Sequence, residues 1–124
     1  MAFEFLSNNT NVEFSATYIK GDERAVTVIQ TDHQNGSDHT TGAANILEKE
    51  GGVAITNDHS HPGNEISNFT PSGFDPRNDK PLPTLQGDRA AAKGFESLYP
   101  SVIQRIYVPM TKDYIRYNSK KVFE

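Results

Sequence analysis

The chain has 124 residues, a formal net charge of −4 and no cysteine. This length fits one domain with its own core, and the lack of cysteine excludes disulfides, thiolate zinc clusters and cysteine nucleophiles. The negative charge argues against a nucleic-acid-binding protein. No apolar run approaches the roughly 18 residues of a membrane span, and Met1–Leu6 lacks the basic and long apolar regions of a signal peptide. We expect one soluble domain over residues 1–124, with neither nucleic acid nor membrane as a partner.

Two segments in the first part of the chain are predicted to form a β-hairpin. Residues 12–18 alternate between apolar and polar side chains, a period of two that is typical of a strand. Residues 25–31 are rich in β-branched side chains, and Gly21-Asp22 supplies a turn between the two segments. Residues 8–11 are polar and are expected only to lead into the hairpin.

The middle of the chain is predicted to hold a short helix, a buried strand and a long loop. Residues 41–50 show a partial apolar stripe that ends at Gly51-Gly52, as a helix would. Residues 53–56 fit a short buried strand. Residues 57–86 contain five of the seven prolines and no periodicity. A loop of this length inside a compact domain is usually functional or disordered.

The last third of the chain predicts one helix and two strands. Asp88 is a favourable residue for the first turn of a helix, and this helix is expected to end at Tyr99-Pro100. Residues 102–108 and 113–117 are predicted strands, and the second could resume at 122–123. The resulting order, β-β-α-β-loop-α-β-β, predicts an α/β fold with a mixed sheet flanked by helices.

Two histidines follow the predicted strand at residues 53–56. Residues i and i+2 of a strand point to the same face, so His59 and His61 can share one metal ion if the strand continues that far. Catalytic zinc takes three protein ligands and keeps a fourth position for water. The third ligand should be a nearby carboxylate, and Asp75 and Asp88 are the two candidates.

A hydrolytic zinc site also needs a general base and a donor for the developing oxyanion. Glu13 is our first candidate for the base, because it lies opposite the apolar face of its predicted strand. Ser72 is the candidate donor. Pro62, Gly63 and the segment around Pro71 are expected to form the rim that receives the substrate.

The segment His59-Ser60-His61-Pro62, followed by Pro71-Ser72 and an aspartate at a helix start, resembles the JAMM/MPN metalloprotease motif. That motif consists of an upstream Glu, then H-[ST]-H-P, then S-x-x-D. The resemblance implies a mixed sheet related to cytidine deaminases, one bound zinc ion (Zn²⁺), and hydrolysis of peptide or isopeptide bonds. Residues 71–74, 87–88 and 106–117 make the chain more similar still to the JAB-like toxin domains of bacterial Rhs-type polymorphic toxins.

The resemblance implies a role for each matching residue. His59 and His61 would be zinc ligands, Ser72 would assist the oxyanion, and Glu13 would be the catalytic acid and base.

The third ligand depends on how the S-x-x-D part of the motif is matched. Ser72-Gly-Phe-Asp75 fits it literally, but Pro76 follows at once and no helix pattern begins there. More residues separate His61 from Ser72 than is usual in the family. The family's ligand aspartate opens a helix, so we predict Asp88 as the third ligand after an insertion, with Asp75 as the alternative.

The function implied by the resemblance is that of a zinc-dependent peptidase or isopeptidase in which a Glu activates a zinc-bound water. Such a domain would be the C-terminal effector of a larger secreted toxin, or else a cytoplasmic enzyme. Its partners would be a peptide or protein substrate, with a ubiquitin-like protein or a peptide cross-link as candidates, and an immunity protein.

Other functions fit the sequence less well. A catalytically dead scaffold of the MPN type would generally have lost a ligand, whereas both histidines, the serine and a candidate Glu are present. A deaminase needs H-x-E and P-C-x-x-C, which are missing. A metallo-β-lactamase-like nuclease needs an aspartate where this chain has Gly63. An iron site with two histidines and one carboxylate usually has an H-x-D pair.

Overall fold

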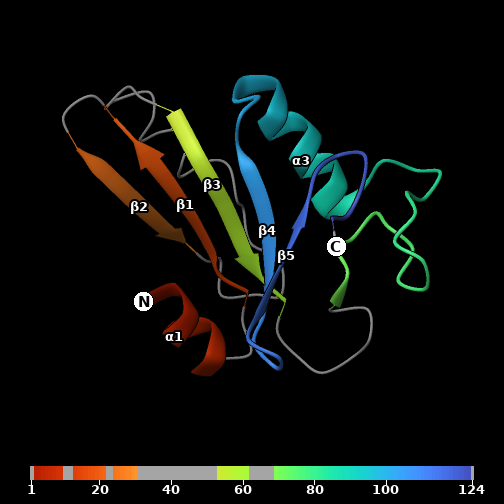
Figure 1. The fold of residues 1–124 in the computed structure, drawn as a ribbon, viewed down its shortest axis with the longest axis horizontal. Coiled ribbons are helices and arrows are strands. Elements are labelled where there is room, and N and C mark those ends of the chain that lie inside the picture. Colours follow the sequence, from red (N-terminus) through yellow and green to blue (C-terminus); the bar gives the residue numbers. More distant parts are fainter. Residues whose placement is uncertain (1, 10–12, 22–23, 31–52, 62–68, 124) are drawn as a thin grey trace.

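The computed structural model describes residues 2–9, 13–21, 24–30, 53–61 and 69–123 (Figure 1). Their strands form one sheet in the order β2-β1-β3-β4-β5. β3 and β4 run parallel, and every other neighbouring pair is antiparallel, so the sheet is mixed. The strands are β1 (Ser15–Lys20), β2 (Ala25–Gln30), β3 (Val53–Ser60), β4 (Ile103–Val108) and β5 (Asp113–Tyr117).

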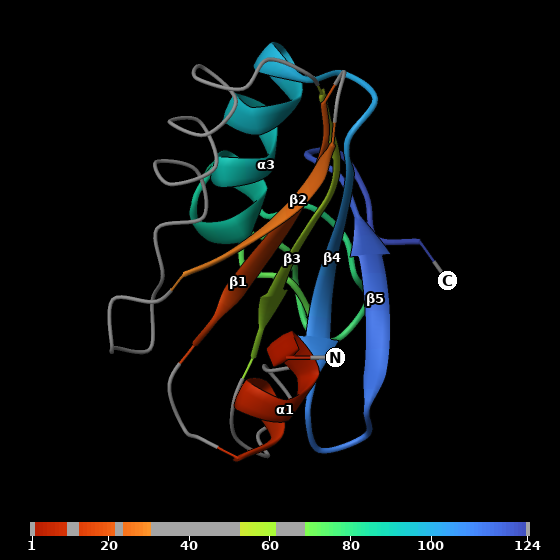
Figure 2. The same ribbon diagram turned by 90° about the vertical axis from the view of Figure 1, so that its left-hand side faces the viewer.

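Two described helices, α1 (Ala2–Asn9) and α3 (Gly87–Leu98), cover opposite faces of the sheet (Figure 2). Successive strand residues point to opposite faces. Tyr107 of β4 therefore packs with Phe3 of α1, while its neighbours Ile106 and Val108 pack with Ala92 of α3. None of the helices in the described ranges is long and apolar enough to span a membrane.

Helix α3 provides the crossover between the parallel strands β3 and β4. It buries Ala92 and Phe95, which are three residues apart and so lie on one face of a helix. Phe95 packs against Ile19 of β1 in the part of the core farther from the first turn of α3. This packing fixes the helix over the sheet, and with it the position of the first turn.

The predicted class, a small α/β domain with a mixed sheet, is confirmed. The helix beginning at Gly87 and the strands near 102–108 and 113–117 match the observed elements within a residue or two. The predicted helix at 41–50 lies outside the described residues. The relation to the cytidine-deaminase fold stays a prediction.

Three expectations differ from the structure. The predicted order lacked α1, whose residues Glu4 and Asn8 accept hydrogen bonds from the hydroxyls of Tyr114 and Tyr107, at 2.8 and 2.9 Å. A helix of eight residues is marginal by itself, so these long-range contacts stabilise it. The first strand begins at Ser15 rather than at residue 12, and β3 continues to Ser60 instead of ending at residue 56.

The two phenylalanines of α1 provide a matched test of how this helix is held. Phe3 is 1% exposed and packs on the sheet, whereas Phe5 is 66% exposed. We expect Phe3→Ala to lower the free energy of unfolding by about 3–5 kcal/mol because it empties a buried site. Phe5→Ala should change it by less than about 0.5 kcal/mol. Urea denaturation measures both values, and equal losses in the two variants would contradict this packing.

Candidate metal centre

The two histidines of the motif lie where β3 ends. His59 lies within the strand, opposite Ile106 of β4. His61 is the first residue after the strand, and its backbone N–H donates to the Tyr107 carbonyl at 2.9 Å. Because they are two residues apart on extended chain, their imidazoles project to the same face, with ring centroids 4.9 Å apart. This is the face that α3 covers.

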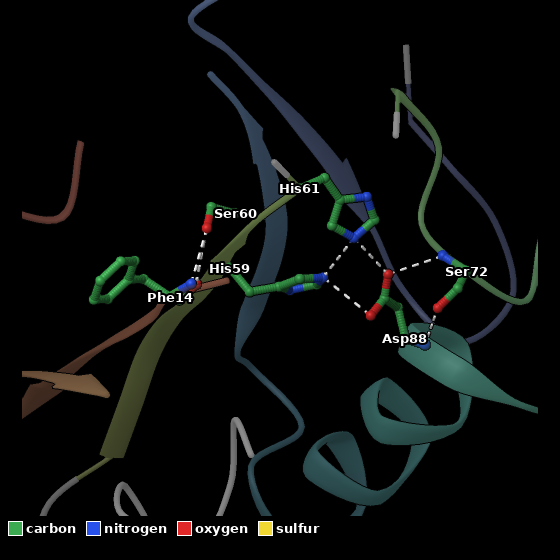
Figure 3. A network of polar contacts seen from close by, with 6 residues as sticks. All are labelled: Phe14, His59, Ser60, His61, Ser72 and Asp88. Carbon is green, nitrogen blue, oxygen red and sulfur yellow. Dashed lines mark hydrogen bonds and ion pairs between the residues drawn. The ribbon is translucent and has the colours of Figure 1, made fainter. Parts of the chain in front are cut away.

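The carboxylate of Asp88 bridges the two imidazoles from the first turn of α3 (Figure 3). Its Oδ1 lies 3.0 Å from His59 Nε2, and its Oδ2 lies 2.9 Å from His61 Nε2. The two Nε2 atoms are 3.1 Å apart. Among the described residues, these three form a group that could hold a metal ion, because their ligand atoms all lie within 4.8 Å of one another.

Ser72 fixes the first turn of α3 through reciprocal hydrogen bonds with Asp88 (Figure 3). The Ser72 N–H donates to Asp88 Oδ2 at 2.8 Å, and the Asp88 N–H donates to Ser72 Oγ at 2.7 Å. Gly87 makes this approach possible. Its φ is +60°, and a Cβ at this position would clash with Ser72 Oγ. Glycine is therefore required both by the left-handed backbone and by the lack of space.

Burial and opposite charge act against each other within the group. Burial works to lower the pKa of His59, but the Asp88 carboxylate, with smaller contributions from Glu13 and Asp58, raises it overall. Burial works to raise the pKa of Asp88, but the two imidazoles hold it well below its ordinary value. The Asp88 carboxylate is thus ionised at neutral pH.

Glu13 and Asp75, the other predicted acidic residues, lie in different surroundings. Glu13 is buried, and its negative charge acts on the pKa of His59, so its carboxylate lies within electrostatic range of the group. Asp75 instead accepts hydrogen bonds from the Arg77 guanidinium at 3.0 and 2.8 Å. These bonds hold the pKa of Asp75 at about 2. The structure therefore brings Asp88, and not Asp75, to the histidines.

One residue beside the site, Tyr117, was not singled out from the sequence. The buried ring of Tyr117 meets the His59 imidazole edge-on, with ring centroids 6.1 Å apart. Burial, and then the charges of Asp88 and Glu13, raise the pKa of Tyr117 well above its ordinary value. The only signal in the sequence was its place at the end of a predicted strand.

The expected substrate rim is described only in part. Pro71 is fully buried, while the adjacent Ser72 is exposed. Pro62 and Gly63 lie outside the described residues.

The His-His-Asp group on a mixed sheet resembles the metal site of JAMM domains. Residues 1–93 match the family model of JAB-like toxin 1, and the chain belongs to this family. The predicted relation to JAB-like toxin domains is thereby confirmed. Neither curated proteins nor solved structures gave a match.

The opposite pKa shifts of His59 and Asp88 predict how the stability of the metal-free domain depends on pH. The raised pKa of His59 stabilises the fold below about pH 6.5, and this contribution is lost as the pH rises through the folded value. The lowered pKa of Asp88 stabilises the fold above about pH 3.9, and this contribution is lost as the pH falls through the folded value. Unfolding free energy should therefore be highest between these limits.

Urea denaturation in the presence of a chelator measures this profile. In Asp88→Asn the decrease in stability above about pH 6.5 should largely disappear, because the asparagine side chain carries no charge to favour the imidazolium. An unchanged profile in this variant would show that the pair does not couple folding to pH.

Proposed function

We propose that this domain is a zinc-dependent peptidase or isopeptidase that acts as the effector of a bacterial polymorphic toxin of the Rhs type, and that residues 1–124 form one such domain. The convergence of His59, His61 and Asp88 is the observation that carries this proposal. Membership of the JAB-like toxin 1 family supports the toxin context and is compatible with a secreted effector.

The donor set fits zinc. Two imidazole nitrogens and one carboxylate oxygen are common ligands of catalytic zinc, and bonds of about 2.0–2.1 Å in a tetrahedron separate ligand atoms by roughly 3.3 Å. The contacts here, 2.9, 3.0 and 3.1 Å, are close to that separation. The side chain of His59 is 1% exposed, whereas those of His61 and Asp88 are 11% and 10% exposed, so solvent reaches the group at His61 and Asp88.

Each further residue of the site has a proposed task. A bound zinc ion would polarise a substrate carbonyl and lower the pKa of a water molecule. Glu13 would take a proton from that water and deliver it to the leaving amine. The Ser72 hydroxyl accepts the Asp88 N–H and so retains its own proton, which it can donate to the carbonyl oxygen as negative charge develops.

The substrate and an inhibiting immunity protein would both bind on the exposed side of the site. Ser72 is exposed and His61 is partly exposed, so an extended peptide or protein tail could approach there. A ubiquitin-like protein and a peptide cross-link are the two substrate candidates. An immunity protein would inhibit the enzyme by covering this side.

Metal binding distinguishes the two candidate aspartates and also tests the scaffold alternative. We expect purified protein to hold about one zinc ion per chain, and His59→Ala and Asp88→Asn to weaken binding more than about 100-fold because each removes one of three ligands. Asp75→Asn is the matched control and should bind zinc normally, since Asp75 is engaged by Arg77. Metal analysis and calorimetric titration measure both. Native protein that binds no zinc would exclude the proposed enzyme.

Glu13→Gln tests the general base separately from the metal. It should reduce amide-bond cleavage by about 10²–10⁴-fold and leave the zinc content unchanged. New peptide termini in a bacterial lysate, detected by mass spectrometry, measure cleavage, and growth of a host that expresses the domain measures toxicity. Glu96→Gln is the control, because the Glu96 carboxylate accepts the Ser119 N–H and lies on α3 about two turns after Asp88. Full cleavage by Glu13→Gln would refute this role.

A further inference from the structure

Ser60 lies between the two histidines in the chain, but its side chain points to the other face of the sheet (Figure 3). It is 0% exposed. The Ser60 hydroxyl accepts the Phe14 N–H at 2.9 Å, and the backbone N–H of Ser60 donates to the Phe14 carbonyl at 2.8 Å. We call these two bonds the Ser60 link.

The Ser60 link differs from regular antiparallel pairing. In the hydrogen-bonded pairs of an antiparallel ladder, the two opposed residues exchange bonds between their backbone groups. Here the Ser60 hydroxyl takes the place of the Ser60 carbonyl as acceptor. The Phe14 amide therefore keeps a partner at the last residue of β3. The next residue, His61, then bonds to the Tyr107 carbonyl of β4.

The same link determines where Glu13 lies. Ser15 pairs with His59 at the end of the β1–β3 ladder, and the Ser60 link continues the pairing by one residue. If this register is continued by one more residue, Glu13 comes to lie across from His61. Side chains alternate between faces, so Glu13 shares the face of Ser15 and His59, in agreement with its effect on the pKa of His59.

We infer that Ser60 is a positioning residue whose hydroxyl holds the segment bearing Glu13 against the strand end bearing His59 and His61. This inference rests on the proposed function, in which Glu13 is the general base. Alanine at this position would offer no side-chain acceptor to the Phe14 N–H, and the full burial of Ser60 keeps water from replacing the hydroxyl. The Phe14 amide would then lose its partner, and the segment before Ser15 would no longer be fixed.

Three variants test this inference through activity and metal binding. Ser60→Ala should bind zinc within about threefold of the native affinity, yet cleave about 10- to 100-fold more slowly, because the base is misplaced and not removed. Ser60→Thr keeps the hydroxyl and should restore cleavage. Thr17→Val is the matched control: it removes another buried hydroxyl between β1 and β3, which donates to Asn57 at 3.1 Å, and it should cleave normally. An equal loss in Thr17→Val would overturn the inference.

Two further measurements separate positioning from general destabilisation. In the Glu13→Gln background, Ser60→Ala should cause no additional loss of cleavage, since the base it positions is already gone. Independent losses would overturn the inference.

Nuclear Overhauser contacts between the Glu13 and His61 side chains, and slow exchange of the Phe14 amide, should both disappear in Ser60→Ala and persist in Ser60→Thr. If they persist in Ser60→Ala, the inference is wrong even where zinc binds. Failure of the native protein to bind zinc would instead exclude the proposed function alone.

Discussion

The bridge from Asp88 to the two imidazoles is the interaction on which the rest of the site depends. It joins the end of β3 to the first turn of α3, two elements separated in the chain by a long segment. An ionised carboxylate that is 8% exposed is costly unless it is paired and hydrogen-bonded. Here the imidazoles and the Ser72 amide satisfy it, and each of these groups must be correctly placed.

The segment before α3, residues 72–86, folds so that Ser72 contacts the Asp88 carboxylate. It closes on itself through backbone bonds, from the Asp75 N–H to the Lys80 carbonyl at 2.8 Å and from the Leu82 N–H to the Gly73 carbonyl at 2.9 Å. The Arg89 guanidinium ties its far end to α3 by donating to the Leu82 carbonyl at 3.1 Å. The segment between Ser72 and Gly87 is therefore long in sequence, but Ser72 still contacts the helix start directly.

This geometry explains why the aspartate of the literal S-x-x-D match does not lie beside the histidines. Asp75 belongs to a local turn, in which its carboxylate accepts both the backbone N–H and the guanidinium of Arg77. Asp88 is sixteen residues after Ser72, yet the two exchange hydrogen bonds. Spacing in the sequence cannot reveal a contact that depends on the closing of a turn. The signal that favours Asp88 in the sequence is its position at the start of a predicted helix.

Other parts of the fold could be predicted only where the pattern was local. The β-branched run of β2 and the alternation before Lys20 indicated strands correctly. Helix α1 gave no such signal, because tyrosine hydroxyls about a hundred residues away hold it. The length of β3 was underestimated because Asn57 and Asp58 are polar, although both are buried with partners on neighbouring strands.

Successive residues of β3 point to opposite faces of the sheet. Asn57 and His59 face α3, where the candidate metal group lies. Asp58 and Ser60 face the α1 side, where they hydrogen-bond to neighbouring segments. Arg105 of β4 donates to both carboxylate oxygens of Asp58 at 2.7 Å. Burial raises the pKa of Asp58, and the guanidinium opposes that rise.

This support extends from the sheet to the first helix of the chain. The Arg105 guanidinium lies 4.3 Å from the centre of the Tyr114 ring, and the Tyr114 hydroxyl donates to Glu4 of α1. Helix α1 is therefore linked, through Tyr114 and Arg105, to the rear face of the strand that carries the candidate ligands. Since a strand shows every second residue to each face, one short sequence can present metal ligands on one side and be held in register from the other.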